Sequence, residues 1–280
     1  APVEQYFADY LSVLESREFN DDGYSCDALV TEEMLQRLSE TDDDLMTNLG
    51  VKEGGLWEYF LENGIQLPPN LIVAGTVNMD ETTHGFSRKV IDRAVTLDFG
   101  EFFPNDYDVF FNQTVEPVSF SWSSKTHASV DSLAGGCDFD GTKSIAFLKS
   151  VNAVLKRTPF ELAYRALNEL LLLVASLGPA NDSELHAVWD DFLMTKVLPR
   201  IEGDDDKLRP NSDNGKTTLL EELDELLTAK LSLIWENKRK DFYRVDSVEG
   251  DAIDIECRSR AKLRWMLDRL EANTFTSFWP

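Results

Sequence analysis

An apolar run followed at once by a polar amide is the first feature of this sequence that could carry chemistry. Leu71 to Val77 (LIVAGTV) is almost entirely apolar, and Asn78 follows it directly. Such a run predicts a strand that is buried on both faces of a parallel sheet. Reactive groups lie just beyond the carboxyl ends of such strands, where an Asn can hold a water with its oxygen and contact a phosphate with its amide group. The plainer alternative is that Asn78 starts a turn.

A basic residue follows one short helix later. Phe86 to Arg93 can form this helix, and Val95 to Phe99 (VTLDF) is expected to form a second short strand. A strand, a loop, a helix and a strand in this order are typical of α/β architecture. Arg93 ends the helix, and the alternative to a functional role is an ion pair with Asp92 or Asp98.

The segment from Gly75 to Ala94 (GTVNMDETTHGFSRKVIDRA) is similar to the sensor-1 segment of AAA+ proteins of the McrB-like group. The resemblance implies that Asn78 is the sensor-1 residue, which orients the attacking water opposite the γ-phosphate. It also implies that Arg93 is the arginine finger that reaches the nucleotide of a neighbouring subunit. Arg88 and Lys89 lie on the same helix and leave this assignment open by one turn. An arginine finger raises the rate of hydrolysis by about 10³- to 10⁵-fold because it neutralises charge that develops during transfer.

The resemblance extends to both sides of this segment. Residues 1–18 resemble the helix that follows the Walker B strand in this group. Residues 159–175 (PFELAYRALNELLLLVA) resemble its lid helix, and Arg165 matches the sensor-2 arginine, which contacts the nucleotide from the lid. Residues 190–203 and 269–279 also match the lid region. The resembling segments follow one another in the order that the group requires.

The implied fold is α/β plus all-α. Residues 1–100 would form the C-terminal part of an AAA+ P-loop NTPase core with an incomplete parallel sheet, 101–140 a connecting segment, and 141–280 a helical lid domain. In the first part, helices are expected over 1–15, 31–39 and 55–62. Apolar residues at helical spacing predict the helices of the second part, over 143–157, 160–177, 183–197, 217–238 and 258–272, and a small hairpin is expected within 241–256.

One segment imitates a phosphate-binding loop. Asn214 to Leu220 (NGKTTLL) looks like the end of a P-loop, but Pro210 occupies the first Gly position and has no N–H to donate to a phosphate. An acidic loop, rather than a buried strand, precedes it. Thr218 and Glu221 instead predict a capping box at a helix start. Because the chain lacks both the Walker A loop and the Walker B acids, we expect this polypeptide alone neither to bind nor to hydrolyse nucleotide appreciably.

The composition excludes several classes of protein. With 51 acids against 27 bases and a net charge of -24, this chain is not expected to bind DNA by itself, because binding requires cations that neutralise phosphates. The longest apolar run, Leu170 to Ala175, is far shorter than the roughly 20 residues of a membrane span. The scattered cysteines and histidines predict a reducing cytoplasm and no metal site. The start lacks Met and signal features, so the chain is expected to begin inside a longer reading frame.

The resemblance therefore implies a fragment of an AAA+ NTPase subunit. In the full-length protein it would assemble as a homo-oligomeric ring, hydrolyse ATP or GTP with Mg²⁺, and power a McrC-like nuclease on DNA in a restriction or phage-defence system. DNA would be contacted by regions absent from this chain, and no nucleotide is expected on the fragment alone. ATP and GTP remain open because the base-contacting residues are not identifiable. The alternatives are a MoxR-like protein-remodelling ATPase and a non-enzymatic acidic interaction or DNA-mimic protein, although a mimic should display its acids as a regular stripe.

Overall fold

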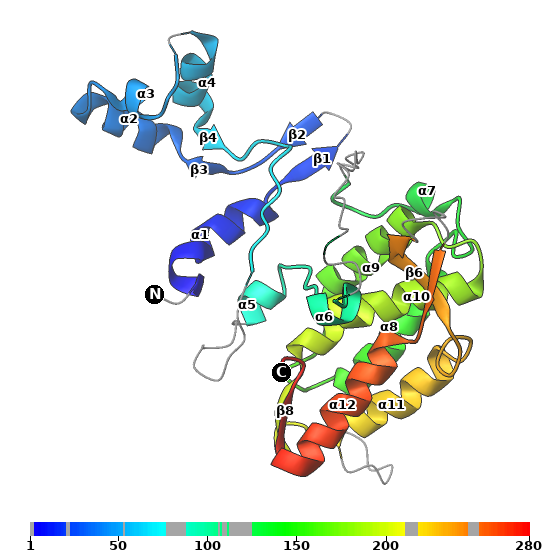
Figure 1. Ribbon diagram of the computed structural model, residues 1–280. Coiled ribbons are helices and arrows are strands. Elements are labelled where there is room, and N and C mark those ends of the chain that lie inside the picture. The colour runs from blue at the N-terminus through cyan, green and yellow to red at the C-terminus, as the bar shows by residue number, and fades with distance from the viewer. Residues whose placement is uncertain are drawn as a thin grey trace. The chain divides into compact units, whose positions relative to one another are not determined.

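The computed structural model describes most of the chain, and Figure 1 labels its elements. The described residues are 3–20, 23–52, 54–76, 88–105, 107, 111, 125–210, 218–245 and 252–280. The chain separates into two compact units. We refer to residues 1–93 with 123–126 as the N-terminal unit, and to residues 94–122 with 127–280 as the helical unit.

The N-terminal unit combines short helices with short antiparallel strand pairs. Its elements are α1 (Val3–Glu15), β1 (Glu18–Asn20), β2 (Gly23–Ser25), β3 (Ala28–Val30), α2 (Glu32–Thr41), α3 (Leu45–Asn48), α4 (Gly55–Asn63), β4 (Ile65–Gln66) and α5 (Arg88–Ile91). Strand β1 pairs with β2, and β3 pairs with β4. The helices predicted over 1–15, 31–39 and 55–62 are confirmed as α1, α2 and α4, and α5 lies within the helix predicted over 86–93.

The apolar run that predicted a buried strand forms none over residues 71–76. Ile72 and Val73 are 56% and 44% exposed. The guanidinium of Arg17 donates instead to the carbonyl of Leu71 at 3.0 Å. A strand of a parallel sheet needs a neighbour to satisfy its backbone groups, and no other described segment pairs with this one. The pattern predicted both burial and strand pairing, and neither is found over residues 72–76.

The second predicted strand, over residues 95–99, is also wrong. Asp98 caps α6 (Phe99–Phe102) by accepting a backbone hydrogen bond, which ends extended structure there. The N–H of Thr96 donates to the carbonyl of Thr195 at 3.1 Å rather than to a strand. Every strand pair in the described part of the chain is antiparallel. The described residues therefore contain no parallel sheet.

The helical unit holds the main core. After α6 its elements are α7 (Val130–Leu133), α8 (Thr142–Leu155), α9 (Tyr164–Leu177), α10 (Asp182–Phe192), the π-helix η1 (Leu193–Val197), the 3₁₀-helix η2 (Leu198–Arg200), β5 (Glu202–Asp204), α11 (Leu219–Lys230), β6 (Arg239–Val245), β7 (Ala252–Ile255), α12 (Arg258–Asn273) and β8 (Phe275–Ser277). The helices predicted over 143–157, 160–177, 183–197 and 258–272 are confirmed. The predicted hairpin is confirmed as the antiparallel pair of β6 and β7.

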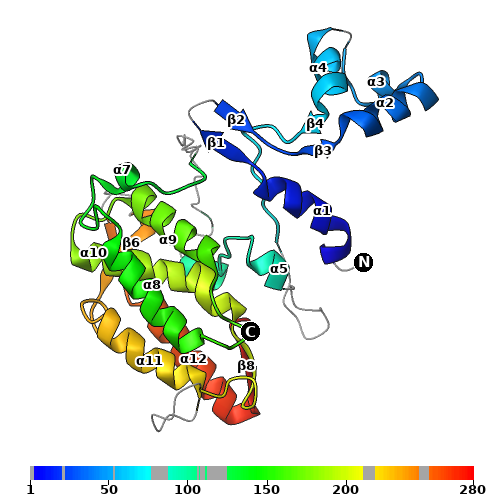
Figure 2. The same cartoon turned by 180° about the vertical axis from the view of Figure 1, so that it is seen from behind.

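The long helices of this unit pack around one apolar core. Helix α8 contacts α9 and α11, while α10 contacts α9 and α12, as Figures 1 and 2 show from opposite sides. Trp189 stacks on Phe147 with ring centroids 4.5 Å apart, and its indole N–H donates to the hydroxyl of Ser144 at 2.9 Å. The buried Trp therefore has a partner for its only polar group, as a packed core requires.

Helix α11 begins as predicted but ends early. The capping box between Thr218 and Glu221 is confirmed, whereas the helix predicted to reach 238 ends at Lys230. The chain continues through turns in which Leu231 and Ile234 remain fully buried. Their apolar spacing reflects burial beyond the end of the helix, so periodicity alone overestimated its length.

Candidate functional site

The structure describes two of the three residues to which the resemblance assigned chemistry, one in each compact unit. Asn78 lies outside the described residues. Arg93 follows α5 in the N-terminal unit, and Arg165 is exposed on the first turn of α9 in the helical unit. Arg88 and Lys89 begin α5, but their side chains are outside the description. Arg93 and Arg165 therefore belong to different units.

Arg93 forms an ion pair with an unexpected partner. Its Nε lies 2.8 Å from the carboxylate of Glu15 at the end of α1, and both side chains are 27% exposed. The sequence offered Asp92 and Asp98 as partners, and neither is the acid seen in this pair. A partner so distant along the chain could not be identified from local spacing. The pair leaves the guanidinium partly accessible, so a second ligand can still reach it.

Five charged residues form a buried ionic cluster in the helical unit. Arg239 of β6 donates from Nε to Asp190 at 2.6 Å and from Nη2 to Asp191 at 2.5 Å. Arg258, at the start of α12, donates to Asp191 at 3.0 Å and to Asp241 at 2.9 Å. All five side chains are at least 96% buried. Buried charges are tolerated when they are paired and hydrogen-bonded in this way.

Asp190 also caps α12. Its carboxylate accepts hydrogen bonds from the backbone N–H groups of Arg258 and Ser259, at 3.0 and 2.7 Å. Burial opposes its charge, but Arg239 and the bonds from Ser259 outweigh burial and lower the pKa of Asp190. The positive end of the helix dipole favours an anion at this position. Asp190 thus ties α10 to the start of α12.

Burial also raises the pKa values of Asp191 and Cys257. Burial raises the pKa of Asp191 to about 6 despite Arg239 and Arg258, and the charge of Asp190 adds to the rise. Burial beside Asp190 also raises the pKa of the Cys257 thiol. A buried thiol with a raised pKa is a poor nucleophile. The cluster is therefore closed to substrate and holds β6, α10 and α12 together.

The sequence contains a signal for this cluster. Asp190 and Asp191 interrupt a largely apolar stretch, LHAVWDDFLM, within one predicted helix. A helix that is apolar on all sides is buried, so acids within it require buried cations. Arg239 and Arg258 lie on elements that come later in the chain, and no local spacing identifies them as the partners.

A second polar cluster surrounds the π-helix η1. Lys196 is nearly buried, and its Nζ lies 2.6 Å from Glu169 of α9 and donates to the carbonyl of Ala94 at 3.0 Å. Burial raises the pKa of Glu169, although Lys196, Arg165 and Arg200 all act in the opposite direction. The cluster gathers three cations around one carboxylate. One of the three is Arg165, the predicted sensor-2 residue, and the sequence did not predict this arrangement.

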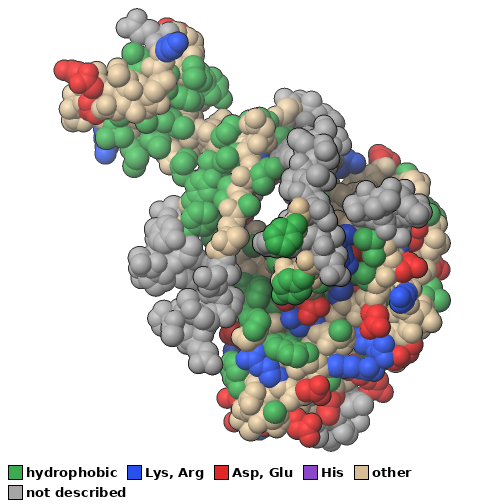
Figure 3. All heavy atoms as spheres, in the orientation of Figure 1, with side chains coloured by type: hydrophobic (Ala, Val, Ile, Leu, Met, Phe, Trp, Pro, Cys, Tyr) green, Lys and Arg blue, Asp and Glu red, His purple; other side chains and the backbone are tan. Residues whose placement is uncertain are grey.

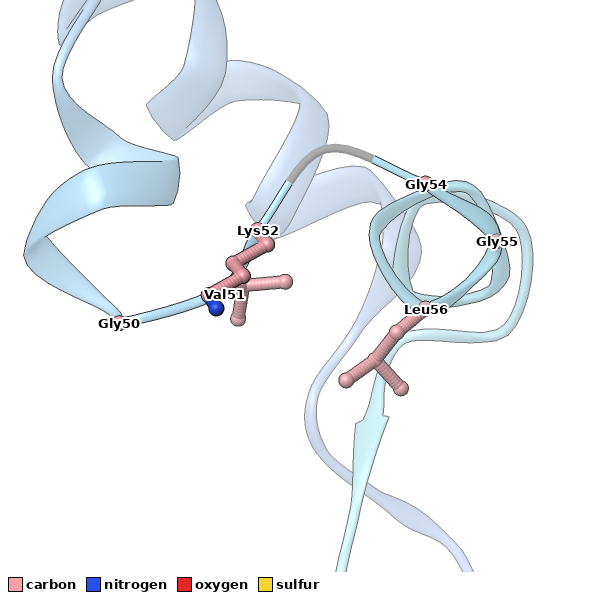
Figure 4. Close-up of a pocket in the computed structure, with 6 residues that line it drawn as sticks. All are labelled: Gly50, Val51, Lys52, Gly54, Gly55 and Leu56. Atoms are coloured by element: carbon pink, nitrogen blue, oxygen red, sulfur yellow. The ribbon is translucent and has the colours of Figure 1, made fainter.

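A shallow, open hollow lies between α3 and α4. Its lining is drawn in Figure 4 and consists of Gly50, Val51, Lys52, Gly54, Gly55 and Leu56. Lys52 is exposed, and the apolar side chains of Val51 and Leu56 share the lining. The hollow is open, and its lining combines one lysine with glycines and apolar side chains.

The described residues contain neither an evident metal site nor a membrane span. No group of three or more His, Cys, Asp and Glu among them is arranged to hold a metal ion. None of the helices in the described ranges is both long enough and apolar enough to cross a bilayer.

The comparisons with known proteins bear on the helical unit. No curated protein and no solved structure matches the chain. Residues 130–275 match the family described as Domain of unknown function (DUF8727). This range runs from α7 to the first residue of β8 and includes the whole buried ionic cluster. Since the match covers more than half of the 280 residues, the chain belongs to the DUF8727 family.

Proposed function

We propose that this chain is the sensing and lid part of a McrB-like AAA+ NTPase subunit. The observation that carries the proposal is the segment from Asn70 to Ala94, in which an apolar run, Asn78 and Arg93 follow one another as in sensor 1 and the arginine finger. Arg165 belongs to a separate compact unit. In the proposal this helical unit is the lid, and Arg165 contacts the nucleotide from it.

The exposed run over residues 71–76 supports this proposal. It is rich in strand-forming apolar residues, and Ile72 and Val73 are exposed. No hydrogen bond joins the backbone of residues 72–76 to another described residue. Unpaired backbone and exposed apolar surface favour addition to a sheet. In the proposal the run becomes the sensor-1 strand when the other strands of the AAA+ core lie beside it.

The surface of the N-terminal unit also suits a larger assembly. Hydrophobic side chains gather on it in Figure 3. The exposed ones include Leu29, Met34, Leu38, Leu56 and Tyr59. Contiguous apolar surface of this kind marks contacts with other protein. We expect neighbouring parts of an NTPase ring to cover it.

In the proposal, the described residues of this chain do not form a nucleotide cradle by themselves. Pro210 stands at the first Gly position of the P-loop-like segment, and the hollow beside Lys52 is open and partly apolar. In the proposal, ATP or GTP and Mg²⁺ are held by groups outside residues 1–280. Asn78 orients the attacking water, and Arg93 stabilises charge at the site of the neighbouring subunit. A McrC-like nuclease acting on DNA is the partner that the resemblance implies.

The proposal is tested by nucleotide hydrolysis in the full-length subunit. Arg93→Ala should abolish hydrolysis and leave nucleotide binding near normal, because the finger acts on charge that develops during the reaction. Arg209→Ala is a matched control, since Arg209 is exposed and forms a local ion pair with Asp206. Equal loss of binding and hydrolysis in Arg93→Ala would assign Arg93 to folding. Absence of hydrolysis in the wild-type subunit would overturn the proposal.

A further inference from the structure

The π-helix η1 aims two polar groups at the segment that follows Arg93. The carbonyl of Thr195 accepts a hydrogen bond from the N–H of Thr96 at 3.1 Å. Lys196 donates from Nζ to the carbonyl of Ala94 at 3.0 Å. Two adjacent residues of η1 therefore hold residues 94–96 by their backbone. We refer to this arrangement as the η1 clamp.

The helix type explains how both groups reach the same segment. A π-helix widens the turn and changes the direction of the side chains and carbonyls that it contains, and such turns are frequent at functional sites. The hydroxyl of Thr195 donates to the carbonyl of Asp191 in α10 at 2.8 Å, while its backbone carbonyl accepts from Thr96. A π-helix is rare, so its position at the clamp is informative.

The clamp is connected to the predicted sensor-2 residue through one acid. Glu169 holds the Nζ of Lys196 at 2.6 Å, and the Lys196 side chain is only 4% exposed. Glu169 lies four residues after Arg165 on α9, so the two side chains share one face of this helix. A charge that engages Arg165 therefore acts close to the acid that holds Lys196.

We propose that Lys196 is a positioning residue that couples Arg165 on the lid to Arg93, the residue that precedes the clamped segment. This inference rests on the proposed function, because it assigns to Arg165 and Arg93 their roles at the nucleotide. Engagement of Arg165 changes the hold of Glu169 on Lys196, and Lys196 transmits the change to the carbonyl of Ala94. Lys196 itself contacts neither nucleotide nor the reacting atoms.

The test compares Lys196→Met with Lys143→Met. Both lysines belong to the helical unit and lie 2.6 Å from an acid, but Lys143 pairs with Asp182 and does not contact residues 94–96. In the full-length subunit, Lys196→Met should lower kcat by about 5- to 150-fold, the usual range of coupling between sites. The Kd for nucleotide should change by less than about 5-fold, the lower end of that range. Lys143→Met should leave both kcat and Kd unchanged. Lys196→Arg, which keeps the charge, should restore part of kcat.

Hydrogen exchange of this chain tests the η1 clamp in the absence of nucleotide. The amide of Thr96 should exchange faster in Lys196→Met than in wild type or Lys143→Met, because its hydrogen bond depends on the clamp. If Lys196→Met fails to fold, Glu169→Gln should raise the exchange of Thr96 and lower kcat in the same direction. Unchanged exchange at Thr96 would overturn the clamp itself. Faster exchange with unchanged kcat would overturn the coupling, and a wild-type subunit without hydrolysis would overturn the proposed function together with it.

Discussion

Arg93 and Glu15 form an ion pair in which the guanidinium Nε lies 2.8 Å from the carboxylate, although the two residues are 78 positions apart in the chain. The pair joins the end of α1 to Arg93, shortly after the end of α5. In the proposed function it holds the arginine finger in place until the nucleotide of a neighbouring subunit is present. Since both side chains are partly exposed, the pair can open without burying an unpaired charge.

This ion pair should contribute little to the stability of the protein. We expect Glu15→Gln and Arg93→Ala each to change the free energy of unfolding by no more than about 1 kcal/mol, because solvent screens ion pairs that are partly exposed. Urea unfolding followed by circular dichroism measures this change. A much larger loss in Arg93→Ala would show that Arg93 is needed for folding and would remove it as a clean probe of hydrolysis.

Removal of a cation from the buried ionic cluster should lower the free energy of unfolding much more. Arg239→Met is expected to lower the free energy of unfolding of the helical unit by about 3–5 kcal/mol, because it leaves Asp190 and Asp191 buried with too few cations. Arg244→Met is the matched control on the same strand. Its side chain is 26% exposed and pairs with Asp241, which Arg258 also holds, so about 1 kcal/mol or less is expected.

Tryptophan fluorescence during urea unfolding measures the stability of both variants, because Trp189 and Trp235 are buried in the helical unit. If Arg239→Met proved as stable as Arg244→Met, the cluster would not be what fixes β6 against α10 and α12.

His186 should make the helical unit sensitive to mild acid. Burial lowers the pKa of His186 from 6.5, its ring stacks on Trp189 with centroids 5.1 Å apart, and its Nδ1 has no hydrogen-bond partner among the described residues. The unfolded chain then takes up a proton near pH 6.5, while the folded chain does so only at lower pH. The stability that neutral His186 contributes is therefore fully present above pH 6.5. It is lost as the pH falls from 6.5 through the pKa of His186 in the folded protein.

His186→Gln should remove this part of the pH dependence while leaving the stability above pH 7 similar. Titration of the histidine ring resonances by NMR gives the pKa directly. A pKa of His186 at or above 6.5 in the folded protein would contradict the expectation.

The three cysteines should differ in reactivity. Cys26 and Cys257 are buried and Cys137 is partly exposed, and burial raises the pKa of Cys257 further from neutrality. We expect a thiol reagent at neutral pH to label Cys137 first and Cys257 only after unfolding, because the thiolate is the reactive form. Mass spectrometry of the labelled peptides measures the order. Rapid labelling of Cys257 in the native protein would show that the ionic cluster opens to solvent.

The sequence predicted the helices of the helical unit because their apolar residues repeat at helical spacing. The capping box at Thr218 and the hairpin of β6 and β7 follow from equally local patterns. Whether residues 71–77 form a strand could not be predicted from their local pattern, because a strand depends on partners that its own residues do not specify. The same reason explains why the pairing of Arg93 with Glu15, and of Asp190 with Arg239, was not foreseen.

The central claim is that Arg93 acts on the nucleotide of a neighbouring subunit. Mixing full-length subunits that carry Arg93→Ala with subunits that carry Asn78→Ala tests it most directly, by the rate of ATP or GTP hydrolysis. Each variant alone should be inactive, but a mixed ring contains some interfaces with an intact Asn78 on one side and an intact Arg93 on the other. With equal, random mixing, about one quarter of the interfaces of a head-to-tail ring should be active, and hydrolysis should return accordingly. A mixture that stays as inactive as its components, while still forming rings that bind nucleotide, would contradict the claim.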